Sequence, residues 1–159
     1  MNSDFKELLQ SFNEAGAKYL VVGGYAVMEY SEPRYTKDLD IWVGTDAENA
    51  PLVYQALAKF GAPIADFSEA DFREPEVFFQ IGVAPVRVDI LTSIIGVDFT
   101  EAWCRRDVRT FAGIPASYIS IEDLITAKIA SGRRQDKADV TALRKSLKQA
   151  QKQLEKNSW

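Results

Sequence analysis

The chain has 159 residues, 47% of them hydrophobic and 26% charged, with a formal net charge of -4, which fits one compact domain and argues against coating long nucleic acid by charge alone. No apolar run approaches the roughly 20 residues of a membrane span and no signal-peptide pattern opens the chain, so we expect a cytoplasmic protein without a membrane partner. One cysteine and no histidine exclude an internal disulfide, a thiolate zinc cluster and histidine-based catalysis, and leave carboxylates, lysines and arginines to carry any chemistry.

The first third of the chain predicts a helix, a strand and a second helix. Apolar residues recur at helical spacing between Phe5 and Ala15, and Gly16 follows as a stop. The apolar run at 19–22 predicts a short buried strand. Gly23-Gly24 then opens a helix that ends before Pro33.

Residues 38–43 alternate strictly, which predicts a half-buried strand. Leu39, Ile41 and Val43 share one face, and Asp38, Asp40 and Trp42 share the other. The stretch between Asp46 and Gly61 predicts an amphipathic helix that covers the sheet. Residues 77–82 and 86–91, separated by a short link at 83–85, predict a hairpin with Asp89 in its second arm.

The last third predicts a short helix at 98–106, one or two strands around Gly113, and two C-terminal helices. Ser120 and Asp123 resemble a capping box that opens a helix to about Gly132. The final helix, at about 136–154, is rich in lysine and arginine, so this tail is suited to meet an anion. The predicted fold class is α+β: a small mixed sheet flanked by helices.

Asp38 and Asp40 form the first candidate site. Their side chains leave the same face of a strand about 7 Å apart, and two carboxylates brought to about 4 Å repel by about 4 kcal/mol at an effective dielectric near 20. A cation such as Mg²⁺, which prefers oxygen ligands, relieves that repulsion. Asp89, on another strand between apolar Val88 and Ile90, adds a third carboxylate as a metal ligand or base. The alternative is a merely solvated face; an EF-hand is excluded, because Trp42 and Val43 occupy its ligand and glycine positions.

Two further features bear on anion binding. Gly23-Gly24 at a helix start lets a phosphate approach bare backbone N–H groups, although an ordinary tight turn is the more common explanation of such a pair in isolation. Lys128 lies on the apolar stripe that contains Ile121, Leu124, Ile125 and Ile129. It either snorkels to the rim or pairs with Asp136 and Asp139.

Three motifs follow one another along the chain: VVGG, then DLDIWV after a spacer of thirteen residues, and later VRVDIL. This order and spacing resemble the nucleotidyltransferase superfamily that includes DNA polymerase β and antibiotic nucleotidyltransferases. The resemblance covers residues 18–91. It implies a nucleotidyltransferase fold in a single domain over 1–159, with a core at about 18–91 and C-terminal strands and helices at about 98–155. It also implies that Gly23 and Gly24 hold an NTP, that Asp38 and Asp40 bind Mg²⁺ (one or two ions, with Mn²⁺ as a substitute), and that Asp89 completes the site.

The segment from Lys128 to Asp139 is similar to a C-terminal motif of abortive-infection nucleotidyltransferases of type IV toxin–antitoxin systems. That similarity implies that Lys128 and Asp136 belong to a nucleotide site, although those toxins are much longer. Arg34 and Thr36 precede the aspartates, where a guanidinium suits a triphosphate; a surface arginine is the alternative. Trp42 either stacks on a base or packs.

Two functional hypotheses follow. The first is a bacterial Mg²⁺-dependent enzyme that moves NMP from an NTP to a hydroxyl of RNA, protein or a small molecule, as a possible toxin–antitoxin or defence component. The second is a catalytically silent nucleotide-binding module that acts as an antitoxin or interaction partner.

Overall fold

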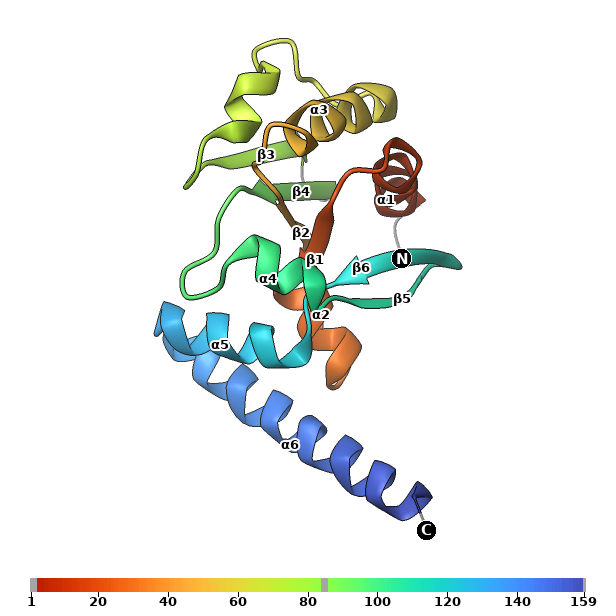
Figure 1. Cartoon of the computed structure of the whole chain (residues 1–159), viewed down its shortest axis with the longest axis vertical. Helices are drawn as coiled ribbons and strands as arrows, with labels where there is room; N and C mark the ends of the chain where they lie inside the picture. Colours follow the sequence, from red (N-terminus) through yellow and green to blue (C-terminus); the bar gives the residue numbers. More distant parts are fainter. Residues whose placement is uncertain (1–2, 84–85, 159) are drawn as a thin grey trace.

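In the described part of the chain, six strands form one mixed sheet in the order β3-β4-β2-β1-β6-β5. In the computed structural model, which describes residues 3–83 and 86–158, β1 pairs antiparallel with β2, β2 parallel with β4, and β1 parallel with β6 (Figure 1). The two hairpins, β3–β4 and β5–β6, are antiparallel. The strands are β1 (Tyr19–Val22), β2 (Asp38–Val43), β3 (Phe78–Val83), β4 (Val86–Leu91), β5 (Asp107–Phe111) and β6 (Ile114–Tyr118).

Helices enclose the sheet and extend from it. The helices α1 and α3 pack on each other, whereas α2 contacts β1 and β2 on one side and α5 and α6 on the other. Figure 1 shows α5 and α6 below the sheet, with the far half of α6 leaving the body. The helices are α1 (Ser3–Ala15), α2 (Gly23–Tyr30), α3 (Asn49–Phe60), the 3-10 helix η1 (Glu69–Arg73), α4 (Phe99–Cys104), α5 (Ile121–Ser131) and α6 (Arg134–Asn157).

The core lies between the sheet and α1, α2 and α3, where apolar periodicity predicted it. Leu8, Leu9, Leu39 and Ile41 are fully buried, which agrees with the predicted inner faces of α1 and β2. Burial of such side chains contributes about 1.5–3 kcal/mol each. The predicted α+β class and mixed sheet are therefore confirmed.

Several local predictions need correction or fall outside the described residues. The helix η1 was not predicted, because its five residues are too short for a helical period to show. Ile129 is 53% exposed and does not belong to the buried stripe of α5. The last two residues of the predicted hairpin link, 84–85, lie outside the described residues. None of the helices in the described part of the chain is both long and apolar enough to cross a membrane.

Candidate active site

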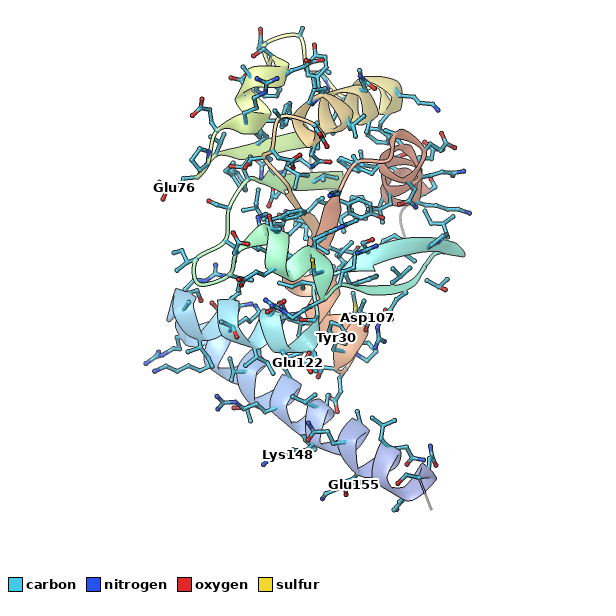
Figure 2. The ribbon with its side chains drawn as sticks, in the orientation of Figure 1. Tyr30, Glu76, Asp107, Glu122, Lys148 and Glu155 are labelled. Carbon is cyan, nitrogen blue, oxygen red and sulfur yellow. The ribbon has the colours of Figure 1, made fainter. Side chains whose placement is uncertain are left out.

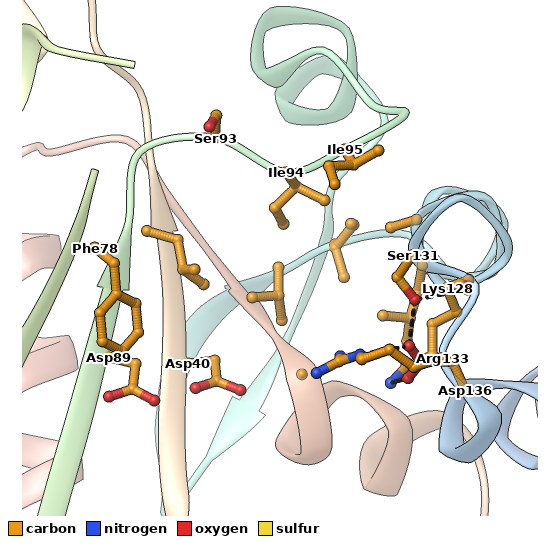
Figure 3. A pocket seen from close by; sticks show the side chains of 16 residues that line it. Asp40, Phe78, Asp89, Ser93, Ile94, Ile95, Lys128, Ser131, Arg133 and Asp136 are labelled. Atoms are coloured by element: carbon orange, nitrogen blue, oxygen red, sulfur yellow. Dashed lines mark hydrogen bonds and ion pairs between the residues drawn. The ribbon is translucent and has the colours of Figure 1, made fainter. Parts of the chain in front are cut away.

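The two strands β2 and β4 bring Asp40 and Asp89 together. They run parallel, and Asp40 is the direct register partner of Asp89. Residues opposite each other on neighbouring strands project from the same face, and Figure 3 shows both carboxylates side by side at the edge of one pocket. Asp38, two residues before Asp40, pairs in register with Arg87. The expected meeting of carboxylates from adjacent strands is thus observed for Asp40 and Asp89.

This crowding changes the ionisation of Asp40. Partial burial is the largest effect; the charge of Asp89, a hydrogen bond with Asp89 and the charge of Asp38 add to it, and Lys128 opposes it only in part. Together they raise the pKa of Asp40 to about 7. Asp89 also accepts a hydrogen bond from Gln80 Nε2, at 3.2 Å from its Oδ1. The sheet side of the pocket therefore has more negative charge than its neighbours compensate.

The start of α2 lies directly against this carboxylate pair. Gly23 has a φ of +65°, and a Cβ built on it would lie 2.0 Å from Asp40 Oδ2. Gly24 is also confined, because its Cβ would lie 2.7 Å from Thr36 Cγ2. At Gly23, only glycine fits a left-handed backbone in such close contact with another residue. The Gly-Gly pair thus does more than turn the chain, since it lets the start of α2 touch Asp40.

The loop before β2 and the first residue of β2 supply polar atoms without partners. Thr36 Oγ1 and Asp38 Oδ1 are buried and have no hydrogen-bond partner in the described structure. With Gly24, Arg34, Asp40 and Asp89 they line a pocket that the first turn of α6 completes with Gln135. Buried polar atoms normally find a partner, so these two oxygens mark a place suited to a ligand.

The Arg34 guanidinium turns toward α6. Its Nη1 lies 2.6 Å from Asp139 Oδ1, and the side chain is 32% exposed. Arg34 is therefore not a free surface arginine, because its guanidinium is paired with Asp139 on α6. Its ion pair ties the loop before β2 to the C-terminal helices.

Lys128 is the centre of a second ionic cluster, on the opposite side of the pocket. Its side chain is 10% exposed, and its Nζ lies 3.0 Å from Asp136 Oδ1 and 2.9 Å from Asp139 Oδ2. Pairing, rather than snorkelling, is the alternative that the structure supports. Arg133 Nε lies 2.9 Å from Asp136 Oδ2.

Asp136 is the most fully satisfied acid of this cluster. Burial alone would raise its pKa, but hydrogen bonds from Ser131 Oγ, Lys128 and Arg133 outweigh that effect and hold the pKa at about 2. Asp136 thus stays ionised, with its charge already matched by the chain's own cations.

A pocket of about 350 Å³ separates the two groups. Figure 3 shows Asp40 and Asp89 on one wall and Lys128, Arg133 and Asp136 on the other. The rest of the lining is largely apolar. It includes Phe78, Leu91, Ile94, Ile95, Ile119 and Leu124.

The predicted site residues all line this region. Gly23, Asp40, Asp89, Lys128 and Asp136 line this main pocket, and Gly24, Arg34, Thr36 and Asp38 line the adjoining one together with Asp40 and Asp89. Within residues 3–83 and 86–158, no group of three or more Asp, Glu, His or Cys side chains is already gathered as a metal cluster. The three-carboxylate metal site therefore stays a prediction. Of the two alternatives for Trp42, packing is the one observed: the residue is 1% exposed and its ring centroid lies 5.1 Å from that of Phe99.

Some residues that line the main pocket or contact its carboxylates were not predicted as part of the site. Gln80 reaches Asp89 because the two are register partners across the β3–β4 hairpin, and fixing that register from sequence would have identified it. Ile94 and Ile95 come from an irregular loop whose path has no periodic signal. Ser131 becomes relevant only through its contact with Asp136.

Three solved structures are similar over most of their length, with identities that support likeness of fold alone. One is the lincosamide antibiotic adenylyltransferase LnuA with lincomycin bound (19% identity, 91% of this chain and 96% of that chain, TM-score 0.58). Another is ANT(2'')-Ia in complex with adenylyl-2''-tobramycin (14% identity, 90% of this chain and 87% of that chain, TM-score 0.59). The third is the nucleotidyltransferase TM1012 from Thermotoga maritima, described as putative (18% identity, 91% of this chain and 91% of that chain, TM-score 0.58).

None of the curated proteins matches the sequence. The family described as "Nucleotidyl transferase of unknown function (DUF2204)" matches it over residues 1–159. This agrees with the resemblance carried by the Gly-Gly pair and the carboxylates on β2 and β4. The chain belongs to this family of nucleotidyl transferases.

Proposed function

We propose that the protein transfers a nucleoside monophosphate from an NTP to an acceptor hydroxyl in a Mg²⁺-dependent reaction. The observation that carries this proposal is the close approach of the start of α2 to Asp40, which is the register partner of Asp89. It joins a helix N-terminus, which favours phosphate, to a pair of carboxylates with which no cation of the described residues forms an ion pair and whose charge Lys128 offsets only in part. The similar fold of LnuA and ANT(2'')-Ia, one described as an adenylyltransferase and the other bound to an adenylylated antibiotic, supports the same reaction class.

The residues present fit a magnesium ion. Asp38 Oδ1 is buried without a partner, and the neighbouring negative charges help raise the pKa of Asp40 to about 7. Both observations describe oxygen ligands that are short of positive charge. Asp38, Asp40 and Asp89 would hold Mg²⁺ or Mn²⁺, which when bound would stabilise negative charge on the phosphoryl oxygens.

The chain's own residues have separate tasks in this mechanism. The backbone at Gly23 and Gly24 binds the triphosphate, because no side chain blocks its approach. Lys128 adds positive charge from the opposite wall and is held in place by Asp136 and Asp139. The acceptor oxygen attacks the α-phosphorus, the bond from the α-phosphorus to the bridging oxygen of the β-phosphate breaks, and pyrophosphate leaves. Asp89 accepts the hydroxyl proton.

The test is transfer of label from α-labelled NTPs to cell-extract components and to candidate acceptors in the presence of Mg²⁺. We expect Asp40→Asn and Asp89→Asn each to lower transfer by about a hundredfold or more, because each removes charge at the reacting centre. Asp66→Asn, an exposed position away from both pockets, is the matched control and should keep full activity.

Two results would overturn this proposal. Unchanged transfer in both site variants would place the chemistry elsewhere. Tight NTP binding by the wild type without transfer to any acceptor would instead support the nucleotide-binding module. In that module the same residues bind the nucleotide, and a partner protein recognises the nucleotide-bound form.

A further inference from the structure

One face of α6 carries a row of cations that the site described above does not use. All its members are exposed, and in the part of the chain that the structure describes none of them forms an ion pair with an acid. Figure 2 shows Lys148 extending from the part of α6 that leaves the body of the protein. The members of this basic row are Arg134, Lys137, Arg144, Lys145, Lys148, Lys152 and Lys156.

The basic row lies on one side of the helix, with a gap of about two turns between Lys137 and Arg144. At 3.6 residues per turn its members fall within an arc of about 120°, and at 1.5 Å per residue they extend over about 33 Å. Glu155 is the one acid on this face, because Asp136 and Asp139 are buried on another face of the helix. Seven of the chain's 19 lysines and arginines lie here, against one of its 23 acids.

An ordinary solvated helix face has a different pattern. It alternates charges so that opposite signs meet four residues apart. Here Arg144, Lys148, Lys152 and Lys156 follow one another at that spacing, and like charges at this spacing destabilise a helix. This self-repulsion is relieved when a polyanion lies along the face.

The basic row begins at the candidate active site. A groove of about 290 Å³ between α5 and α6 is lined by Lys128, Arg133, Lys137 and Arg144 and by no acid. Lys128 and Arg133 also line the pocket that contains Asp40 and Asp89. An anion that follows the row toward the start of α6 therefore arrives at the carboxylates.

We propose that the basic row binds the phosphate backbone of a single-stranded nucleic acid and delivers its terminal hydroxyl to the pocket. This inference rests on the proposed function and names its acceptor. A row of about 33 Å is longer than an antibiotic-sized acceptor needs and suits a ligand with regularly repeated charge. A membrane is a poor alternative, because beyond Leu143 the described part of α6 has only Leu147, Ala150 and Leu154 as apolar residues and no aromatic one.

The transfer step balances for this acceptor. The terminal hydroxyl oxygen of the strand forms a bond to the α-phosphorus of the NTP, and pyrophosphate leaves with the electrons of the broken P–O bond. The hydroxyl proton passes to Asp89. The product is a strand one nucleotide longer.

The first experiment measures binding of single strands of about 12 nucleotides, one of RNA and one of DNA with the same sequence, to the full chain at several salt concentrations. The test variant is Arg144→Gln/Lys148→Gln/Lys152→Gln. The control, Lys6→Gln/Lys59→Gln/Arg73→Gln, makes the same change in net charge on α1, α3 and η1. We expect at least about a tenfold loss of affinity for the test variant alone, with a salt slope lower by about 2, from roughly 0.7 per lost phosphate contact.

The second experiment measures label transfer from α-labelled NTPs to the same strands with a free or a blocked terminal hydroxyl. Labelling of the free strand alone, reduced in the test variant and not in the control, supports the proposal, and the RNA and DNA arms identify the sugar. Equal affinity of the test and control variants, or binding to an acidic peptide or anionic vesicles in preference to the strands, overturns it. Strand binding through the row without transfer to any acceptor overturns the proposed function instead.

Discussion

Asp40 and Asp136 lie on opposite walls of one pocket, yet their ionisation shifts in opposite directions. Burial and two neighbouring aspartates raise the pKa of Asp40 to about 7. Asp136, although burial acts against it, has its pKa lowered to about 2 by Ser131, Lys128 and Arg133. The sheet wall, which carries Asp40 and Asp89, is short of positive charge. The helical wall, which carries Lys128, Arg133 and Asp136, contains its own cations.

The difference separates a wall that is arranged for a ligand from one that is arranged for stability. The acids of the helical wall hold Lys128 and Arg34 in place, so these cations are positioned before any nucleotide arrives. The sheet wall keeps its acids close together at a cost in stability. Such a cost is typical of functional sites, where an incoming cation or substrate relieves it.

The largest expected effect is a loss of stability, and we expect it for a substitution in the helical wall and not for one in the sheet wall. Asp136→Asn leaves the buried ammonium of Lys128 with Asp139 alone, and breaking a buried ion pair costs about 3 kcal/mol, or roughly 6–12 °C in Tm for a chain of this size. Asp40→Asn removes a repelling charge and should leave the metal-free protein as stable as the wild type or more so. Urea unfolding of both variants measures the two effects.

A double variant sharpens this prediction. Lys128→Met/Asp136→Leu removes both members of the pair and should recover part of the stability that Asp136→Asn loses, because no unpaired charge remains in that pair. Equal destabilisation by Asp40→Asn and Asp136→Asn would show that the two walls do not differ as described.

A smaller effect is expected from glycine substitutions, which test how closely α2 approaches the sheet wall. Gly23→Ala and Gly16→Ala both place a side chain at positive φ, +65° and +72°, at about 1 kcal/mol each. Only at Gly23 does the new Cβ meet another residue, Asp40 Oδ2 at 2.0 Å, which adds about 1 kcal/mol of overpacking. The free energy of unfolding should fall about twice as far for Gly23→Ala as for Gly16→Ala.

Nucleotidyl transfer separates the two glycines further. Gly23→Ala displaces the Asp40 carboxylate from Asp89 and should lower transfer strongly, while Gly16→Ala, whose Cβ has nothing within 4 Å, should leave it unchanged. If both variants transfer label like the wild type, the close approach at Gly23 has no catalytic role.

The two walls also differ in how far the sequence could predict them. The strict alternation of residues 38–43 and the apolar flanks of Asp89 were enough to place the acids of the sheet wall on strands of one sheet. The same local patterns also predicted most helix boundaries to within two or three residues. Such patterns act over a few residues, which is why they are visible in a single sequence.

The helical wall depended on packing between elements far apart in the chain. The contact of Arg34 with Asp139 joins residues 105 positions apart, and no periodicity predicts such a pair. The register that places Gln80 beside Asp89 depends on the geometry of the hairpin. Trp42 alternates with its neighbours as an exposed residue would, but α4 covers it through Phe99.

The smallest effect we expect is a pH dependence of opposite sign on the two walls of the metal-free protein. The folded state binds the Asp40 proton more tightly than the unfolded chain, whose pKa is near 3.8. Asp40 therefore lowers stability as pH rises from about 4 to about 7. Because Asp40 is only half-buried, we expect a loss of about 1 kcal/mol, or 2–4 °C in Tm.

Asp136 contributes in the other direction. Its folded pKa of about 2 lies below the unfolded value of 3.8, so its stabilisation is present above pH 4 and is lost as pH falls toward 2. Thermal unfolding against pH should show that Tm falls between pH 4 and 7 in the wild type and not in Asp40→Asn. Asp136→Asn should reduce only the loss of Tm below pH 4. Mg²⁺ binds ionised carboxylates, so its addition should reverse the fall in the wild type; a fall that persists unchanged in Asp40→Asn would assign it to another group.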